Sequence, residues 1–76
     1  MTTLSQPIET PFIRLDAFLK LVGLVDSGGQ AKHRIQEGGY LVNGVVCTQR
    51  GKKLRPGDIV QAVGGERCFA VADGAG

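Results

Sequence analysis

Apolar residues recur at helical spacing in the first part of the chain. Leu15, Phe18, Leu19 and Val22 stand at positions i, i+3, i+4 and i+7, which places them on one face of a helix. Gly23 follows this run and can adopt the left-handed conformation that ends a helix. The pattern therefore predicts a short first helix that begins at Leu15 or one residue later.

A second helix is predicted immediately downstream. Ser27 and Gln30 have the spacing of a capping box, in which two side chains satisfy free N–H groups at the start of a helix. Two apolar residues follow one turn apart, and the pair Gly38-Gly39 supplies a helix stop. We therefore expect a helix of about ten residues from Gly28, close to the common length. The two helices and their tight connection resemble a helix-turn-helix.

The pattern changes to that of strands after the second helix. Asn43-Gly44 stands between two short apolar runs, and this dipeptide is the strongest short-range signal for a β-hairpin. The register stays open at this point. A two-residue turn puts Tyr40, Val42, Val45 and Cys47 on one face, whereas a bulge at Gly44 moves Val46 to the face of Val42.

The last third of the chain reads as a second pair of strands. A polar and basic loop or irregular strand end leads to Leu54-Arg55-Pro56-Gly57-Asp58, where proline and glycine favour a type II turn. A strand over Ile59–Val63, a two-residue turn at Gly64-Gly65 and a partner strand over Arg67–Val71 are expected to follow.

These elements predict the fold class α+β. We expect two short helices packed on a small antiparallel or mixed sheet of four to five short strands. Residues 1–10 show no periodicity and are expected to form a flexible N-terminal tail. The expected organisation is one domain over residues 11–72 and a C-terminal tail over residues 73–76.

Charge is distributed unevenly along the chain. The segment from Lys32 to Arg55 holds six cations and one acid, a balance of +5, whereas the remaining residues hold three cations and six acids, a balance of −3. The net charge of +2 therefore conceals a polarised molecule. A concentrated positive field suits a polyanion such as nucleic acid.

Length and composition exclude several functional classes. A chain of 76 residues supports one small core and no large catalytic cleft. The two cysteines are not in metal-binding spacing, and without a signal peptide they are expected to be reduced in the cytoplasm. No apolar run approaches the ~20 residues that span a bilayer. We expect no cofactor, no membrane association and no small-molecule substrate.

Five motifs in this order resemble the S4-type RNA-binding domain, also called the alpha-L motif. The resemblance covers about Phe12 to Val63 and implies a small, free-standing bacterial RNA-binding protein without a catalytic domain. The motifs are Arg14-Leu15-Asp16, Gly23, Ser27 with Ala31-Lys32 and Ile35, Gly38 with Val42-Asn43-Gly44, and Leu54-Arg55-Pro56-Gly57-Asp58-Ile59.

The resemblance and the charge pattern together indicate a set of RNA-binding residues. The family usually places arginine after the serine of the second helix, and this chain has Gly28 there. Bare N–H groups at the helix start can bind a phosphate instead, although glycines can also serve close packing of the two helices. The candidate RNA-binding residues are Ser27, Gly28, Gly29, Gln30, Lys32, Asn43, Arg50, Lys52, Lys53 and Arg55.

Helix geometry separates two of the cations. Lys32 and Arg34 project about 160° apart, so they cannot serve one surface equally. We predict that Lys32 contacts phosphate and that Arg34 is a solvated charge. Tyr40 can stack on a base, but its place in a half-buried strand favours a role in the core or at its rim. His33 is expected to be an exposed side chain and not a metal ligand.

The function predicted from the sequence is non-catalytic binding of structured RNA, ribosomal or otherwise folded, through a basic face. The alternative is a protein-interaction adaptor for an acidic partner. No nucleophile–base pair or paired carboxylates can be assembled, so an enzyme is not expected. Few aromatic residues are available for stacking, which favours recognition of backbone and shape. A monomer is compatible with these features, and the sequence leaves the oligomeric state open.

Overall fold

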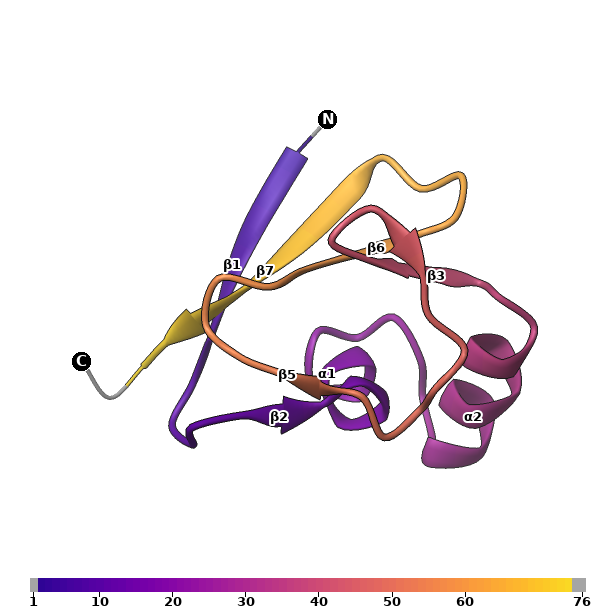
Figure 1. The fold of residues 1–76 in the computed structure, drawn as a ribbon, viewed down its shortest axis with the longest axis horizontal. Coiled ribbons are helices and arrows are strands. Elements are labelled where there is room, and N and C mark those ends of the chain that lie inside the picture. Colours follow the sequence, from indigo (N-terminus) through magenta and orange to yellow (C-terminus); the bar gives the residue numbers. More distant parts are fainter. Residues whose placement is uncertain (1, 75–76) are drawn as a thin grey trace.

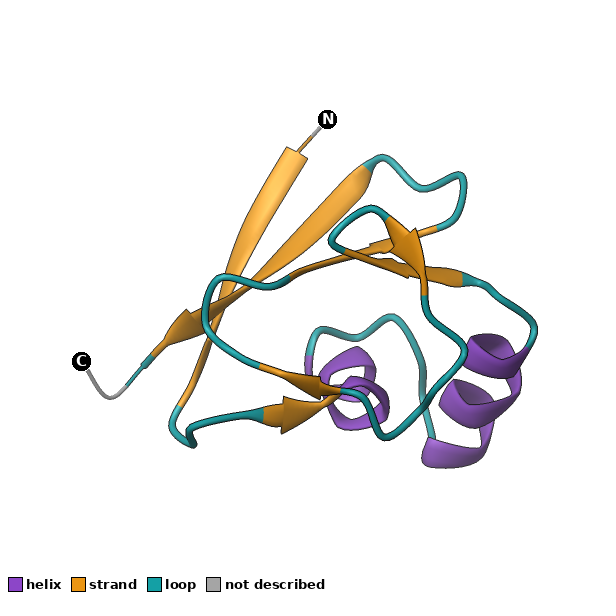
Figure 2. Ribbon diagram, in the orientation of Figure 1, coloured by secondary structure: helices purple, strands orange, loops and turns teal. Residues whose placement is uncertain are grey.

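A computed structural model describes residues 2–74 of the chain. It contains two helices, a five-stranded mixed sheet in the order β1-β7-β6-β3-β4, and a two-stranded sheet of β2 and β5 (Figures 1 and 2). The predicted α+β class is confirmed. The elements are β1 (Thr2–Ile8), β2 (Ile13–Arg14), α1 (Leu15–Leu21), α2 (Gly28–Gln36), β3 (Tyr40–Val42), β4 (Val45–Val46), β5 (Lys53–Leu54), β6 (Ile59–Ala62) and β7 (Arg67–Asp73).

α2 has the boundaries that its capping residues predict, and α1 begins at Leu15 without a side-chain cap. The Ser27 hydroxyl accepts a hydrogen bond from the backbone N–H of Gln30 at 3.1 Å, so α2 begins at Gly28. The Gln30 side chain reaches back one residue further than in a standard capping box, because its Oε1 accepts from the N–H of Asp26 at 2.7 Å. Gly38 has a φ of +79° and ends the helix.

The hairpin of β3 and β4 has a two-residue turn. Asn43 and Gly44 have φ values of +53° and +83°, as a type I′ turn requires at both central positions. Val42 pairs with Val45 and Leu41 pairs with Val46, so no bulge is present. This register decides the open question and places Val42 and Val45 on the same face of the hairpin.

The expectation of a flexible tail over residues 1–10 is wrong for Thr2–Ile8. These residues form β1, which pairs in parallel with β7 from Thr2 opposite Arg67 to Ile8 opposite Asp73. The strand lacks apolar alternation because it is an edge strand held by main-chain hydrogen bonds, and main-chain bonding is independent of side-chain pattern. Asp73, which was expected in the C-terminal tail, is the last residue of β7. Residues 1, 75 and 76 lie outside the described residues.

The connection between β6 and β7 is longer than predicted. Residues 63–66 form it, whereas a two-residue turn at Gly64-Gly65 was expected. The Gly65 N–H donates to the carbonyl of Ala62 at 2.9 Å, which closes a β-turn one residue before the expected one. The turn that precedes β6 agrees with the expectation, since Gly57 has a φ of +103° and Asp58 N–H donates to Arg55 O.

The core lies between the two helices and one face of the five-stranded sheet. Val42, Val60 and Phe69 are direct neighbours across β3, β6 and β7, and all three are buried. The burial of these residues and of the apolar helix residues removes apolar surface from water, and this stabilises a domain of this size. The largest fully buried side chains are Phe18, Leu15, Leu19, Ile35, Leu54 and Val60.

A small polar network joins the hairpin turn to the turn before β6. The Asn43 carboxamide donates to Asp58 Oδ1 at 3.1 Å and accepts from the N–H of Ile59 at 2.9 Å. Asp58 Oδ2 accepts from the N–H of Arg55 at 2.8 Å. This N–H lowers the pKa of Asp58, burial opposes the shift, and the amide of Asn43 and the charges of Lys52 and Arg55 act in the lowering direction.

The shift of Asp58 predicts a pH dependence of stability. Because the folded-state pKa lies below the ordinary value of 3.8, the ionised carboxylate stabilises the fold above that pH, and this contribution is lost as the pH falls through the folded pKa. We expect Asp58→Asn to reduce the acid dependence of the free energy of unfolding, measured by urea denaturation at several pH values below 5 or so.

Asp26→Asn is the matched control. The Asp26 carboxylate accepts no hydrogen bond among residues 2–74, so this variant should keep the acid dependence of the original chain. The same slope for Asp58→Asn and Asp26→Asn would show that the Asp58 network does not contribute to stability.

Candidate nucleic-acid interface

The segment from Arg50 to Arg55, here called the basic segment, is held against the start of α1. The carbonyls of Lys52 and Arg50 accept hydrogen bonds from the N–H groups of Leu15 and Asp16 at 2.8 and 3.1 Å. The first N–H groups of a helix have no partner within the helix, so the segment serves as a backbone cap. β5 continues the attachment by pairing with β2. The four cationic side chains of the segment meanwhile remain exposed.

Arg14 joins this group of cations, and the sequence reasoning did not include it. Its guanidinium bonds Asp16 Oδ2 at 3.1 Å and lies beside Gly51, while 53% of the side chain stays exposed. A Cβ at Gly51 would stand 3.8 Å from Arg14 Nη2. In the sequence Arg14 lies outside the cationic segment from Lys32 to Arg55, in the part of the chain with a negative balance. The signal that could have identified it was its place in the motif that opens the first helix.

Lys53 is positioned by an aromatic ring. Its ammonium lies 4.9 Å from the centroid of Phe12, within the range of a cation–π interaction. Phe12 is the one exposed aromatic residue within residues 2–74, because Phe18, Tyr40 and Phe69 are buried. Tyr40 is only 3% exposed, so it belongs to the core and presents no free ring for stacking.

The start of α2 is open to solvent. A Cβ added at Gly28 would meet no atom within 4 Å, and one at Gly29 would meet only the Ser27 hydroxyl at 4.0 Å. Close packing against α1 therefore does not require these glycines. Their backbone N–H groups have no acceptor in the described part of the chain. Ser27 and Gln30 differ from them, since both side chains are used in capping.

A shallow hollow connects the start of α2 with α1. It has a volume of about 290 Å³ and places Gly28 beside two cations of the first helix region. Arg14 and Lys20 supply these positive charges, and Asp16 supplies one negative charge. The surface near Gly28 is thus more basic than the local sequence indicates. Its lining residues are Arg14, Asp16, Ala17, Lys20 and Gly28.

The remaining candidates have different environments. Lys32 and Arg34 are both exposed on α2. His33 pairs with Glu37 across one helical turn at 3.0 Å, and residues 2–74 contain no group of three potential metal ligands. The carboxamide of Asn43 is used on both sides by the network with Asp58 and Ile59, so the structure gives Asn43 a role in folding.

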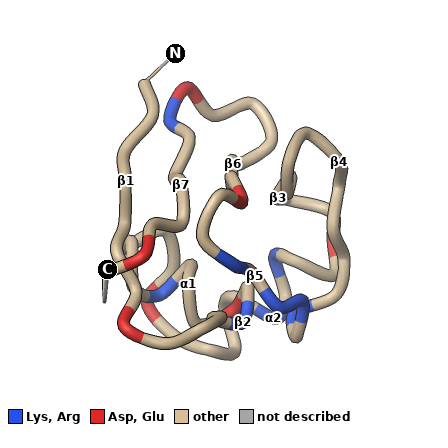
Figure 3. Tube along the Cα trace, turned by 60° about the vertical axis from the view of Figure 1, so that its left-hand side comes forward, with Lys and Arg blue, Asp and Glu red and all other residues tan. Residues whose placement is uncertain are grey.

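The distribution of charge follows the fold. Figure 3 shows that most Lys and Arg positions gather around β5 and α2, with others beside α1 and at one end of β7, whereas Asp and Glu positions are spread around the trace. Backbone capping of α1 brings the basic segment to this region although it is separated from α2 by the hairpin. Neither helix in the described residues has the length and apolar content needed to cross a bilayer.

A solved structure is similar to this fold over nearly the whole chain. The solution structure of YbcJ from E. coli has a TM-score of 0.64 and 36% sequence identity, and the similarity covers 95% of this chain and 87% of that one. The YbcJ structure reveals an alfaL motif involved in RNA-binding. An identity of this size supports relationship as well as a common fold.

Sequence relatives are small proteins and parts of larger ones. The probable ribosome maturation protein RlbA of Bacillus subtilis is 44% identical over 57 residues, which cover 75% of this chain and 80% of that protein. The tyrosine–tRNA ligase of Nitratidesulfovibrio vulgaris is 43% identical over 51 residues, covering 67% of this chain and 13% of the ligase. Small ribosomal subunit protein uS4 of Rhodopirellula baltica is 40% identical over 53 residues, covering 70% of this chain and 26% of that protein.

These similarities agree with the motifs along the chain. The sequence matches the family described as S4 domain over residues 6–71, which is most of its length. The match begins within β1 and ends within β7, so it includes both helices and every strand in whole or in part. Together with the relatives and the shared fold, this match shows that the chain belongs to the S4 domain family.

Proposed function

We propose that this protein binds structured RNA, ribosomal RNA in particular, without catalysing a reaction. The observation that carries the proposal is the attachment of the basic segment to the start of α1, which places its cations near those of the two helices. We name the resulting set the basic surface. It consists of Arg14, Lys20, Gly28, Gly29, Lys32, Arg50, Lys52, Lys53 and Arg55.

The chemistry of the basic surface suits the sugar-phosphate backbone. Lysine and arginine contacts to phosphates release counterions, and this term supplies most of the sequence-independent affinity for nucleic acid. The open N–H groups of Gly28 and Gly29 add donors at the positive end of the α2 dipole. Position 28 has glycine in place of the family's arginine. Arg14 and Lys20 provide positive charge in the hollow that Gly28 lines.

The small number of free aromatic faces favours folded RNA over unpaired strands. Readers of single-stranded RNA stack bases on exposed aromatic rings. Here one face of the Phe12 ring lies against the Lys53 ammonium, and the other three aromatic residues are buried. Recognition of helical shape and phosphate positions is therefore the better match. The ribosome-related relatives support ribosomal RNA as the target and the cytoplasm as the location.

A salt titration tests the proposal. If four to six cations of the basic surface contact phosphates, log K for a folded ribosomal RNA fragment should fall with log salt concentration at a slope of about −3 to −5. Fluorescence anisotropy over a range of potassium chloride concentrations measures this slope. A slope near zero, or equal affinity for duplex DNA, would favour the alternative of an adaptor for an acidic protein.

Gly28→Ala separates phosphate binding from helix packing. The added Cβ meets no atom of the protein, and alanine is a better helix former than glycine, so the thermal midpoint should stay equal or rise. RNA affinity should fall by about threefold, the cost of one weakened hydrogen bond at the helix start. A lower thermal midpoint with unchanged affinity would instead assign Gly28 to packing.

The two exposed cations of α2 form a matched pair. Lys32→Ala should weaken RNA binding by about threefold or more through the loss of one phosphate contact. Arg34→Ala should change affinity less than twofold or so, because its side chain leaves the helix on the opposite flank. Binding isotherms at one salt concentration compare the two variants, and equal losses would show that RNA does not prefer the Lys32 flank.

A further inference from the structure

The end of the β3–β4 hairpin extends beyond the part of the sheet that the helices cover. Val42 and Val45 are paired and share the face that looks toward the core. Val42 is only 7% exposed, whereas Val45 is 69% exposed. Val45 is therefore an apolar residue on the inner face of the sheet that no other element covers. Exposed valines are common singly, but this one lies at the edge of a hollow.

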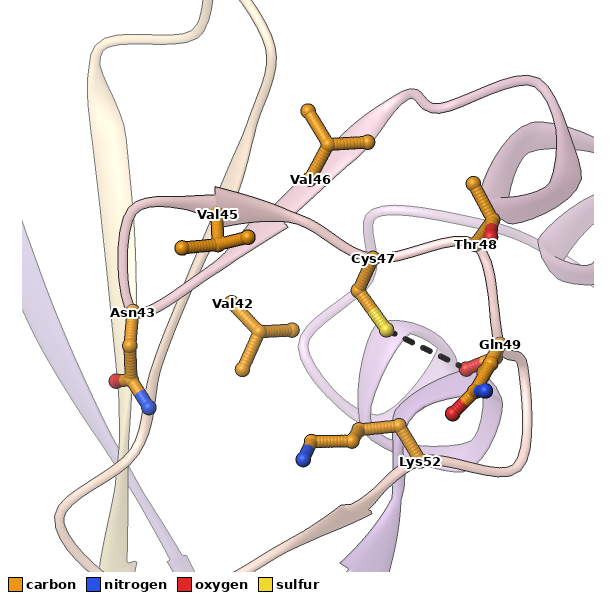
Figure 4. Close-up of a pocket in the computed structure, with 8 residues that line it drawn as sticks. All are labelled: Val42, Asn43, Val45, Val46, Cys47, Thr48, Gln49 and Lys52. Atoms are coloured by element: carbon orange, nitrogen blue, oxygen red, sulfur yellow. Dashed lines mark hydrogen bonds between the residues drawn. The ribbon is translucent and has the colours of Figure 1, made fainter.

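The opposite wall of this hollow is formed by residues that lead into the basic segment. Figure 4 shows Val42, Val45 and Cys47 on the hairpin side, with Gln49 and Lys52 reaching toward the same space from the following loop. The volume is about 360 Å³, near the lower limit of small-molecule sites in proteins. The hollow is separate from the one beside Gly28, which different residues line.

The lining combines three kinds of chemistry. Val42, Val45 and Cys47 provide an apolar wall, and Lys52 provides a positive charge. The Thr48 hydroxyl and the Gln49 carboxamide form no hydrogen bond with other residues in the range 2–74, so they remain available to a ligand. Asn43 also borders the hollow, but its carboxamide is occupied by Asp58 and Ile59.

An unpaired nucleotide combines the three properties that complement this lining. Its base has apolar faces and a polar edge with donors and acceptors, and its phosphate carries a negative charge. We propose that the hollow receives the base of an unpaired nucleotide that projects from the folded RNA, while Lys52 contacts the adjacent phosphate. This inference rests on the proposed function and adds a specific subsite to it. An apolar side chain of a protein partner would leave the charge of Lys52 without a counterpart.

The subsite accounts for a feature that backbone recognition leaves unexplained. Phosphate contacts position an RNA helix but do not distinguish one helical site from another. A bulged nucleotide marks one position along a helix, and a hollow that accepts its base can select that position. The hollow thereby gives selectivity without an aromatic ring in its lining.

Two RNA hairpins of the same stem test the proposal. One stem is fully paired, and the other carries a single bulged 2-aminopurine, whose fluorescence reports the environment of the base. We expect the protein to bind the bulged hairpin about fivefold more tightly than the paired one, because burial of the base against the apolar wall adds to the backbone contacts. The fluorescence of the bulged base should change on binding.

The decisive variant is Val45→Ser, with Val63→Ser as its control. Val63 is 55% exposed and lies outside the hollow, so the two substitutions remove similar apolar surface at different places. Both are at exposed positions and should leave the thermal midpoint nearly unchanged. We expect Val45→Ser to bring the two hairpins to within about twofold of each other, and Val63→Ser to retain the preference.

The outcomes separate failure of the subsite from failure of RNA binding. Salt-dependent binding of both hairpins with equal affinity would overturn the subsite and leave the proposed function intact. Absence of binding to either hairpin would overturn both. A titration with free AMP tests whether the bound base belongs to an RNA. Saturation by AMP without a preference for the bulged hairpin would overturn the proposal that the hollow binds a base of a folded RNA.

Discussion

The arrangement of the candidate interface depends on two backbone hydrogen bonds. Leu15 and Asp16 donate their N–H groups to the carbonyls of Lys52 and Arg50, and these bonds satisfy donors that the start of α1 would otherwise leave free. The acceptors lie 37 and 34 residues later in the chain. Because carbonyl oxygens make the attachment, the positively charged side chains remain exposed to solvent. The same bonds therefore close the fold and assemble the cations near both helices.

Concentrating positive charge has an electrostatic cost, and the structure contains one feature that reduces it. Asp58 lies at the turn after the basic segment, where its carboxylate accepts the N–H of Arg55 and the amide of Asn43. The nearby charges of Lys52 and Arg55 favour its ionised form and lower its pKa further. This network also links the hairpin turn to β6. The residues that shape the hollow at Val45 and those that support the basic segment are thus connected through Asn43.

Membership of the S4 domain family, the relatives and the local geometry support the same functional proposal at different levels. The family and the shared fold indicate RNA as the partner class. The exposed cations and the open start of α2 indicate where phosphates are proposed to bind. Tyr40 is buried and Phe12 is the one exposed aromatic residue within residues 2–74, so few rings are free for base stacking, which favours folded RNA. The hollow beside Val45 then offers a means of selecting one place on an otherwise uniform helix.

The sequence by itself determined the elements whose signals are local. Ser27 and Gln30 define the start of α2, Asn43-Gly44 defines the hairpin, and Pro56-Gly57 defines the tight turn before β6, because capping and positive φ depend on neighbouring residues. It also identified the exposed cations from Lys32 to Arg55. Only the tertiary structure decided what depends on distant partners. Thr2–Ile8 is a strand because β7 provides main-chain partners. Arg14 joins the basic surface because the carbonyls of Arg50 and Lys52 bond to the start of α1 beside it. Asn43 is occupied because Asp58 meets it across fifteen residues. Hydrogen bonds between segments far apart in the chain leave no local pattern that a sequence can show.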